Sequence, residues 1–110
     1  MIKEDLVHHR DGEPFENIKN GIKRMEIRLN DEKRRGIELN HIIKIINRDN
    51  EDEVLFVRVV GLSRFPSFEK LYSVFGDKIK DYEKEILSRV YSKEKEERCG
   101  VLVIHIELLR

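Results

Sequence analysis

The sequence contains no alanine, threonine, glutamine or tryptophan, and it has one cysteine and two prolines. The absence of threonine excludes every mechanism in which a threonine hydroxyl is the nucleophile. Because Cys99 is alone, an internal disulfide and a cysteine-based zinc site are excluded, which favours a reducing cytoplasm. No apolar run exceeds about five residues, so a membrane-spanning helix is not expected. The start, Met1 to Asp5, lacks the apolar segment of a signal peptide, so secretion is not expected.

The residues that are abundant describe a globular protein with a densely charged surface. Charged residues make up 40% and hydrophobic residues 39% of 110 positions, and 22 basic residues balance 22 acidic ones. Many lysines and glutamates without glutamine are typical of thermophile proteins, so we expect a hot-growing source. A chain of this length forms one domain, which we place over residues 1–110.

The positive charge is concentrated in the first third of the chain. Seven basic residues against three acidic ones lie between Lys19 and Arg35. The acidic stretch from Asp49 to Glu53 compensates for them. Basic and acidic residues alternate from Asp77 to Arg98, which is typical of solvated helix faces with pairs of charges one turn apart.

Periodicity and turn residues predict strands and helices in an irregular order. The expected strands are Leu6 to His9, Met25 to Leu29, a hairpin of Ile42 to Ile46 with Val54 to Leu62, and Val101 to Leu109. The expected helices are Pro14 to Gly21, Ser67 to Gly76, a stripe of Tyr82, Ile86 and Val90, and a turn at Ser92 to Arg98. Because strands and helices do not alternate regularly, the class is α+β, and a small, partly open barrel fits it.

The predicted core follows the apolar positions of these elements. It comprises Phe15, Ile18, Met25, Ile27, Leu29, Ile43, Ile45, Leu55, Val57, Val59, Leu71, Phe75, Leu102, Ile104 and Ile106. We expect the strand Met25 to Leu29 to lie in the interior of the sheet. The stripe of Tyr82, Ile86 and Val90 is also interpreted as core, since apolar residues at helical spacing usually face one. Asn30 to Gly36 is expected to be a polar turn.

The most informative stretch is Gly21-x-Lys23-x-x-Glu26-x-Arg28, where a helix ends and a strand begins. Glu26 and Arg28 are two residues apart on a strand, so they share a face at roughly 7 Å. A carboxylate, a guanidinium and a nearby lysine could bind an anion or a base edge. The competing interpretation is a solvent-facing strand with ordinary charges, which short patterns often turn out to be.

The chain resembles the ASCH domain family (activating signal cointegrator homology), part of the wider PUA-like group, from about Glu13 to Leu109. The matching features are Glu13-Pro14-Phe15 through Gly21, Lys23-x-x-Glu26-x-Arg28, Leu29-Asn30 through Arg35, the strand Ile42 to Ile46 with Asn47-Arg48, the helix opening Phe65 to Leu71, and the strand after Gly100. The family commonly has Gly-Asp where this chain has Asn40-His41. The resemblance implies a PUA-like small β-barrel of five to six mostly antiparallel strands, with two to four helices beside a cleft.

The resemblance also implies a ligand, because the family cleft is thought to meet RNA or nucleotides. Small bacterial members resemble or act as hydrolases that deacetylate acetylated cytidine with a lysine, a threonine and a glutamate, and a ribonuclease activity has been attributed to one member. Lys23 matches the lysine, whereas Glu26 stands at the threonine position. Lys23 and Glu26 would therefore be catalytic only if the protein is a hydrolase, with water as the nucleophile.

RNA or nucleotide binding is the first functional hypothesis, and hydrolysis of a modified nucleoside or of RNA is the alternative; whether the protein is an enzyme stays open. The expected ligand-binding residues are Lys23, Glu26, Arg28, Lys33, Arg34, Arg35, Arg48 and Arg64, with Tyr82 stacking on a base. A third hypothesis is a protein-interaction domain that uses the charged helices between Asp77 and Arg98. Neither a metal nor a cofactor is expected, because the histidines lack partners at ligand spacing. We expect a monomer that does not bind membranes.

Overall fold

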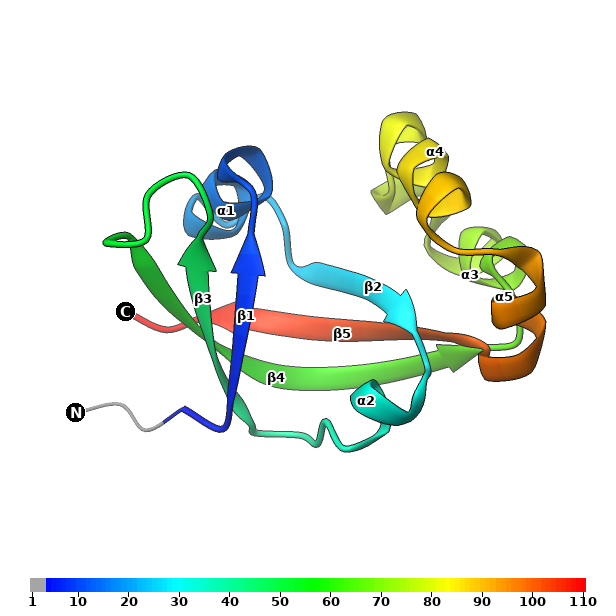
Figure 1. Ribbon diagram of the computed structural model, residues 1–110, viewed down its shortest axis with the longest axis horizontal. Helices are drawn as coiled ribbons and strands as arrows, with labels where there is room; N and C mark the ends of the chain where they lie inside the picture. The colour runs from blue at the N-terminus through cyan, green and yellow to red at the C-terminus, as the bar shows by residue number, and fades with distance from the viewer. Residues whose placement is uncertain (1–3) are drawn as a thin grey trace. The chain divides into compact units, whose positions relative to one another are not determined.

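The computed structural model describes residues 4–110, which form five strands and five α-helices (Figure 1). In chain order the elements are β1 (Leu6–Arg10), α1 (Gly12–Lys19), β2 (Met25–Leu29), α2 (Glu32–Arg35), β3 (Ile42–Asn47), β4 (Val54–Phe65), α3 (Phe68–Phe75), the 3₁₀ turn η1 (Gly76–Lys78), α4 (Asp81–Val90), α5 (Lys93–Cys99) and β5 (Val101–Leu108). The α+β class and the five strands are confirmed. The expectation about secretion rests partly on residues 1–3, which lie outside the described residues.

The five strands form one sheet in the order β1-β3-β4-β5-β2. β1 pairs with β3 in parallel, with Leu6 opposite Ile43, whereas β3 and β4 form the predicted antiparallel hairpin. The expectation that Met25–Leu29 lies in the sheet interior is wrong, because β2 is at one end of this order beside β5. Alternation of apolar residues shows that one face of a strand is buried, but it does not show how many strands pair with it.

The chain forms two compact units, to which β2, β4 and β5 each contribute residues. The first unit comprises the residues up to Glu26, Ile37–Leu62 and Ile104–Arg110. Its buried apolar residues come from α1, from β3, β4 and β5, and from Ile37 in the segment before β3. They include Phe15, Ile18, Ile43, Ile45, Val57, Val59, Ile104 and Ile106, all of which the sequence predicted.

The second unit comprises Ile27–Gly36 and Ser63–Val103. Its buried apolar residues include Ile27, Leu29, Phe68, Leu71, Ile79 and Val101–Val103. The α3 helix begins at Ser67, whose hydroxyl accepts a hydrogen bond from the Lys70 amide at 3.2 Å. Glu96 of α5 accepts another from the Phe68 amide at 2.9 Å. The start of α3 is therefore capped by two segments of the unit, which fixes α5 against it.

Some predicted core residues are not buried. Met25, Leu55 and Phe75 are only partly covered, and the stripe of Tyr82, Ile86 and Val90 is exposed at 45%, 49% and 63%. The interpretation of this stripe as core is wrong, because helical periodicity shows an amphipathic face but not what covers it.

Two short segments differ in detail from what the sequence predicted. The expected polar turn at Asn30 to Gly36 contains the single helical turn α2, which raises the number of helices to five. The Asp31 side chain caps this turn by accepting from the Arg34 amide at 3.1 Å. Asn40, which stands where the family commonly has glycine, has a φ of 71°. Asparagine is one of the few residues that tolerate this left-handed conformation, so the turn before β3 forms without glycine.

Candidate functional site

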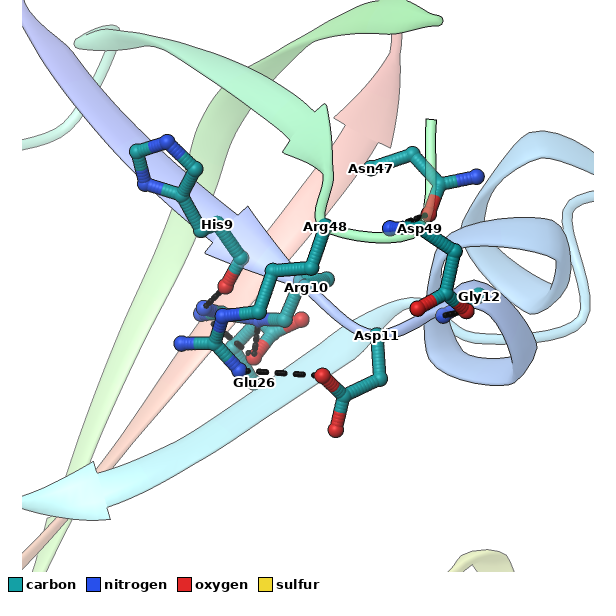
Figure 2. Close-up of polar contacts among 8 residues, drawn as sticks. All are labelled: His9, Arg10, Asp11, Gly12, Glu26, Asn47, Arg48 and Asp49. Atoms are coloured by element: carbon teal, nitrogen blue, oxygen red, sulfur yellow. Dashed lines mark hydrogen bonds and ion pairs between the residues drawn. The ribbon is translucent and has the colours of Figure 1, made fainter. Parts of the chain in front are cut away.

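The first unit contains a buried ion pair at the motif glutamate (Figure 2). Glu26 is only 2% exposed, and its Oε2 accepts from Nε of Arg10 at 3.0 Å and lies 2.9 Å from Nη2 of Arg10. Arg10 is the last residue of β1, whereas Glu26 belongs to β2. The pair therefore joins two strands that are separated in the sheet order by three others. Hydrogen bonds between ionised groups at this distance are stronger than neutral ones.

Neighbouring groups on β1 hold the Arg10 guanidinium in position. Its Nη1 donates to the carbonyl oxygen of His9 at 2.6 Å, and Nη2 lies 3.4 Å from Nδ1 of His8. The backbone carbonyl of Arg10 accepts from the Arg48 amide at 2.8 Å. With its side chain and backbone both engaged, Arg10 presents a fixed cation to the buried carboxylate.

The loop between β3 and β4 fastens the start of α1 beside this pair (Figure 2). Arg48 donates to Oδ1 of Asp11 at 3.1 Å, and the Gly12 amide donates to Oδ2 of Asp49 at the same distance. The buried Asn47 fixes the loop, because its Oδ1 accepts from the Asp49 amide at 2.9 Å. The Asp11 side chain makes no cap of its own, so Asp49 supplies the carboxylate that favours a helix N-terminus.

Three of the predicted site residues lie in this unit: Lys23, Glu26 and Arg48. Lys23 is half-buried in the segment after α1, and its amide donates to the Asn17 carbonyl at 3.0 Å. Arg48 is exposed and bound to Asp11. The structure brings Glu26 together with Arg10, which was not among the predicted residues.

The other predicted residues lie in the second unit. Arg28 is half-buried and donates to the Ile27 carbonyl at 2.7 Å. Arg34 forms an ion pair with Asp31 at 3.5 Å.

Lys33, Arg35 and Arg64 are exposed in the same unit. Within residues 4–110 none of the three has a carboxylate within ion-pair distance. Arg35 uses one nitrogen, Nε, to donate to the Asn30 carbonyl at 3.1 Å. Tyr82 lies exposed on α4, and its stacking on a base stays a prediction.

Sequence reasoning missed Arg10 and Asp49. A buried glutamate on a strand requires a cation, because an unpaired buried charge is costly. That rule predicts that a partner exists, but it does not select one of 22 basic residues. Only the fold, which brings the end of β1 to Glu26 on β2, identifies Arg10. Asp49 gave no local signal, since it caps a helix 37 residues away in sequence.

The described part of the chain contains neither a metal-binding cluster nor a membrane-spanning helix. Between residues 4 and 110 no three His, Cys, Asp or Glu side chains are placed to bind a metal ion. No helix in that range is long and apolar enough to cross a bilayer.

The buried Glu26 and the preceding Lys23 lie in a segment that a known family model matches, the ASCH domain, over residues 11–110. The chain belongs to the ASCH domain family. Arg10, which binds the motif glutamate, lies one residue before the matched range.

Two solved structures are similar to this ASCH protein. The crystal structure of hypothetical protein PH0355 is 31% identical, with a TM-score of 0.75 over 94% of this chain and 98% of that one. The solution NMR structure of protein PF0455 from Pyrococcus furiosus is 29% identical, with a TM-score of 0.72 over 96% of this chain and 97% of that one. No curated protein sequence matches.

Proposed function

We propose that this ASCH protein binds single-stranded RNA through its phosphates. The observation that carries the proposal is the set of exposed cations Lys33, Arg35 and Arg64, which we call the phosphate-contact set. Membership of the ASCH family is consistent with a PUA-like RNA-binding fold and makes RNA the first ligand to test.

The ion pairs decide which cations belong to this set. A cation already bound to a carboxylate loses that partner when it binds a phosphate, which reduces the net gain. Arg34 and Arg48 have such partners, in Asp31 and Asp11. Lys33 and Arg64 have none among the described residues, and Arg35 retains both terminal nitrogens of its guanidinium for a bidentate contact with a phosphate. Among the predicted site residues, these three therefore gain most from a phosphate.

The motif residues receive different roles in this proposal. Glu26 is buried and bound to Arg10, so it serves as an anchor between β1 and β2 and not as the general base of a hydrolase. Arg28 of the second unit is half-buried, and it would bind a base edge or a phosphate; Lys23 of the first unit, also half-buried, would do the same independently. In this role Glu26 acts by holding its strand in place.

The proposal is tested by fluorescence anisotropy of short labelled single-stranded RNAs at low salt. We expect saturable binding that unlabelled RNA competes away and that mononucleotides compete for only weakly, since each mononucleotide offers few phosphates. Equal competition by mononucleotides would indicate a nucleotide site. No anisotropy change at any protein concentration would contradict the proposal. Incubation with acetylated cytidine and with RNA, followed by product analysis, tests hydrolysis separately.

A further inference from the structure

The sheet of the first unit has one buried face and one face that is partly open to solvent. On β3, Ile43 and Ile45 are 1% exposed, whereas Lys44 between them is partly exposed. Successive side chains of a strand point to opposite faces, so Lys44 lies on the face opposite the core. α1 contacts β3, and its Gly12 lies beside Asn47, which is buried on the same face as Ile43 and Ile45. α1 therefore packs on the core face of β3, away from Lys44.

A row of three side chains crosses this open face. Lys44 on β3 is paired with Val7 on β1 and with Phe56 on β4. Directly paired residues point to the same face of a sheet, and in an antiparallel pair their Cβ atoms are about 5 Å apart. We call Val7, Lys44 and Phe56 the Lys44 row. Val7 is 48% exposed and the other two are partly exposed, so solvent reaches the row on all three strands.

Among the described residues, Phe56 is the one phenylalanine that is neither buried nor packed against another ring. Phe15 and Phe68 are buried, and Phe65 and Phe75 pack edge to face with their ring centroids 6.0 Å apart. Phe56 is partly exposed, and within residues 4–110 no aromatic ring or cation lies against its ring. An aromatic ring on the open face of a sheet is where several RNA-binding modules stack a base.

The Lys44 ammonium group has no carboxylate within ion-pair distance in the described part of the chain. The nearby Arg58 of the same face is bound to Glu107 at 2.7 Å. Lys44 therefore leaves a positive charge beside an exposed ring. A nucleotide complements both groups, because its base stacks on the ring while its phosphate binds the ammonium group. A partner with an apolar surface would instead bury this charge without a counter-charge, which is costly.

We propose that the Lys44 row is a second RNA-contact site, in which one base stacks on Phe56 and the phosphate of the same nucleotide binds Lys44. This inference rests on the proposed function, because it assigns a further contact to the same single-stranded ligand. The row is separate from the phosphate-contact set, which belongs to the second unit. Every base has a face that can stack, so the row adds affinity for single strands without selecting a sequence.

Tryptophan fluorescence tests the stacking directly, because the chain has no tryptophan of its own. Phe56→Trp places a single fluorophore in the row, and its emission should be quenched as a short single-stranded RNA saturates the protein. The matched control is Val74→Trp, at an exposed apolar position of α3 in the other unit (62% exposed), whose emission should stay unchanged. An oligonucleotide of the same length without bases should leave the emission of both variants unchanged.

Two further substitutions separate the contribution of the ring from that of the charge. Phe56→Leu should weaken RNA binding about fivefold or more and retain the salt dependence, since it removes only a stacking surface. Lys44→Gln should make the slope of log affinity against log salt shallower by about 0.7, the value of one phosphate. Lys19→Gln is its control and should retain the slope, because Lys19 of the same unit is already paired with Glu53 at 3.9 Å. Circular dichroism verifies that each variant is folded.

The possible outcomes distinguish this inference from the proposed function. If RNA saturates the wild type in anisotropy while the emission of Phe56→Trp stays unchanged, the inference alone is overturned. RNA binding that Phe56→Leu and Lys44→Gln leave unaffected would overturn it as well. No anisotropy change in the wild type would overturn both proposals. Emission of Phe56→Trp that changes with protein concentration in the absence of RNA would show a second copy on this face and would contradict the inference.

Discussion

The ion pair between Arg10 and Glu26 is buried. The side chains are 13% and 3% exposed, so both charges have lost most of their hydration. An intact buried pair adds little net stability, since desolvation offsets the attraction between the charges. Breaking it is costly, because the remaining charge stays in the interior without its partner. The pair therefore specifies which segments come together more than it stabilises them.

Arg10→Met should lower the free energy of unfolding by about 3–5 kcal/mol, since it removes the cation that the buried Glu26 carboxylate binds. Urea denaturation measures the change. The double variant Arg10→Met/Glu26→Leu should recover most of the loss. The control is Arg58→Met, which breaks an exposed pair with Glu107 at 2.7 Å and should cost less than about 1 kcal/mol. Equal losses at Arg10 and Arg58 would contradict the anchoring role of Glu26.

Tyr72 should ionise above its ordinary pKa of 10.0, because burial raises the pKa of its phenol and the Glu96 carboxylate raises it further. As the pH rises, the Tyr72 phenol therefore loses its proton at a lower pH in the unfolded chain than in the folded one. The contribution to stability is thus complete below pH 10 and declines above it. Ultraviolet absorbance of tyrosinate measures the titration, and Tyr72→Phe assigns it.

Glu96→Gln should move the Tyr72 titration back toward its ordinary value, since it removes the charge while the amide oxygen still caps Phe68. A titration that does not move in this variant would show that Glu96 contributes nothing to the shift.

At the scale of elements, the start of α1 depends on a loop far away in the sequence. Asp49 accepts from the Gly12 amide, and a side chain at position 12 would place its Cβ 2.5 Å from Oδ2 of Asp49. A side chain at position 12 would therefore displace the Asp49 carboxylate from the cap. Sequence signals placed the helix correctly, but the residue that caps it lies on another element.

Asp49→Ala should lower stability by about 1 kcal/mol, the usual value of a helix cap, and thermal unfolding followed by circular dichroism measures the loss. Asp52→Ala is the matched control, because Asp52 is an exposed carboxylate of the same loop. If the two variants lose equal stability, Asp49 does not act as a cap.

The positions of the helices and strands in the sequence were largely predictable, whereas the elements that each one contacts were not. Ser67, Ser92 and the two hairpin strands marked boundaries that the structure confirms within a few residues. The position of β2 at the end of the sheet and the exposure of Tyr82, Ile86 and Val90 on α4 depend on tertiary neighbours, which periodicity does not show. Among the site residues, Lys33, Arg35 and Arg64 are exposed and their ligand-binding role stays a prediction, whereas the Arg10 partner of Glu26 could be identified only from the fold.

For the whole molecule, we predict high thermal stability that comes from many modest ion pairs and not from an enlarged core. The ion pairs are mostly exposed and local, so each contributes little at room temperature and more as the temperature rises. We expect a Tm far above that of ordinary mesophile domains, as measured by scanning calorimetry. Unfolding at about 50 °C would contradict the inference of a thermophile source.

We propose that Lys33, Arg35 and Arg64 bind the phosphates of RNA. The salt dependence of the RNA affinity tests this binding most directly. Each phosphate neutralised on a single strand contributes a slope of about −0.7 in log affinity against log salt. The variant Lys33→Ala/Arg35→Ala/Arg64→Ala should bind more weakly and have a slope shallower by about 2. A control that removes three exposed cations of α5, Lys93→Ala/Lys95→Ala/Arg98→Ala, should retain the wild-type slope. Equal slopes for the wild type and the first variant would contradict the claim.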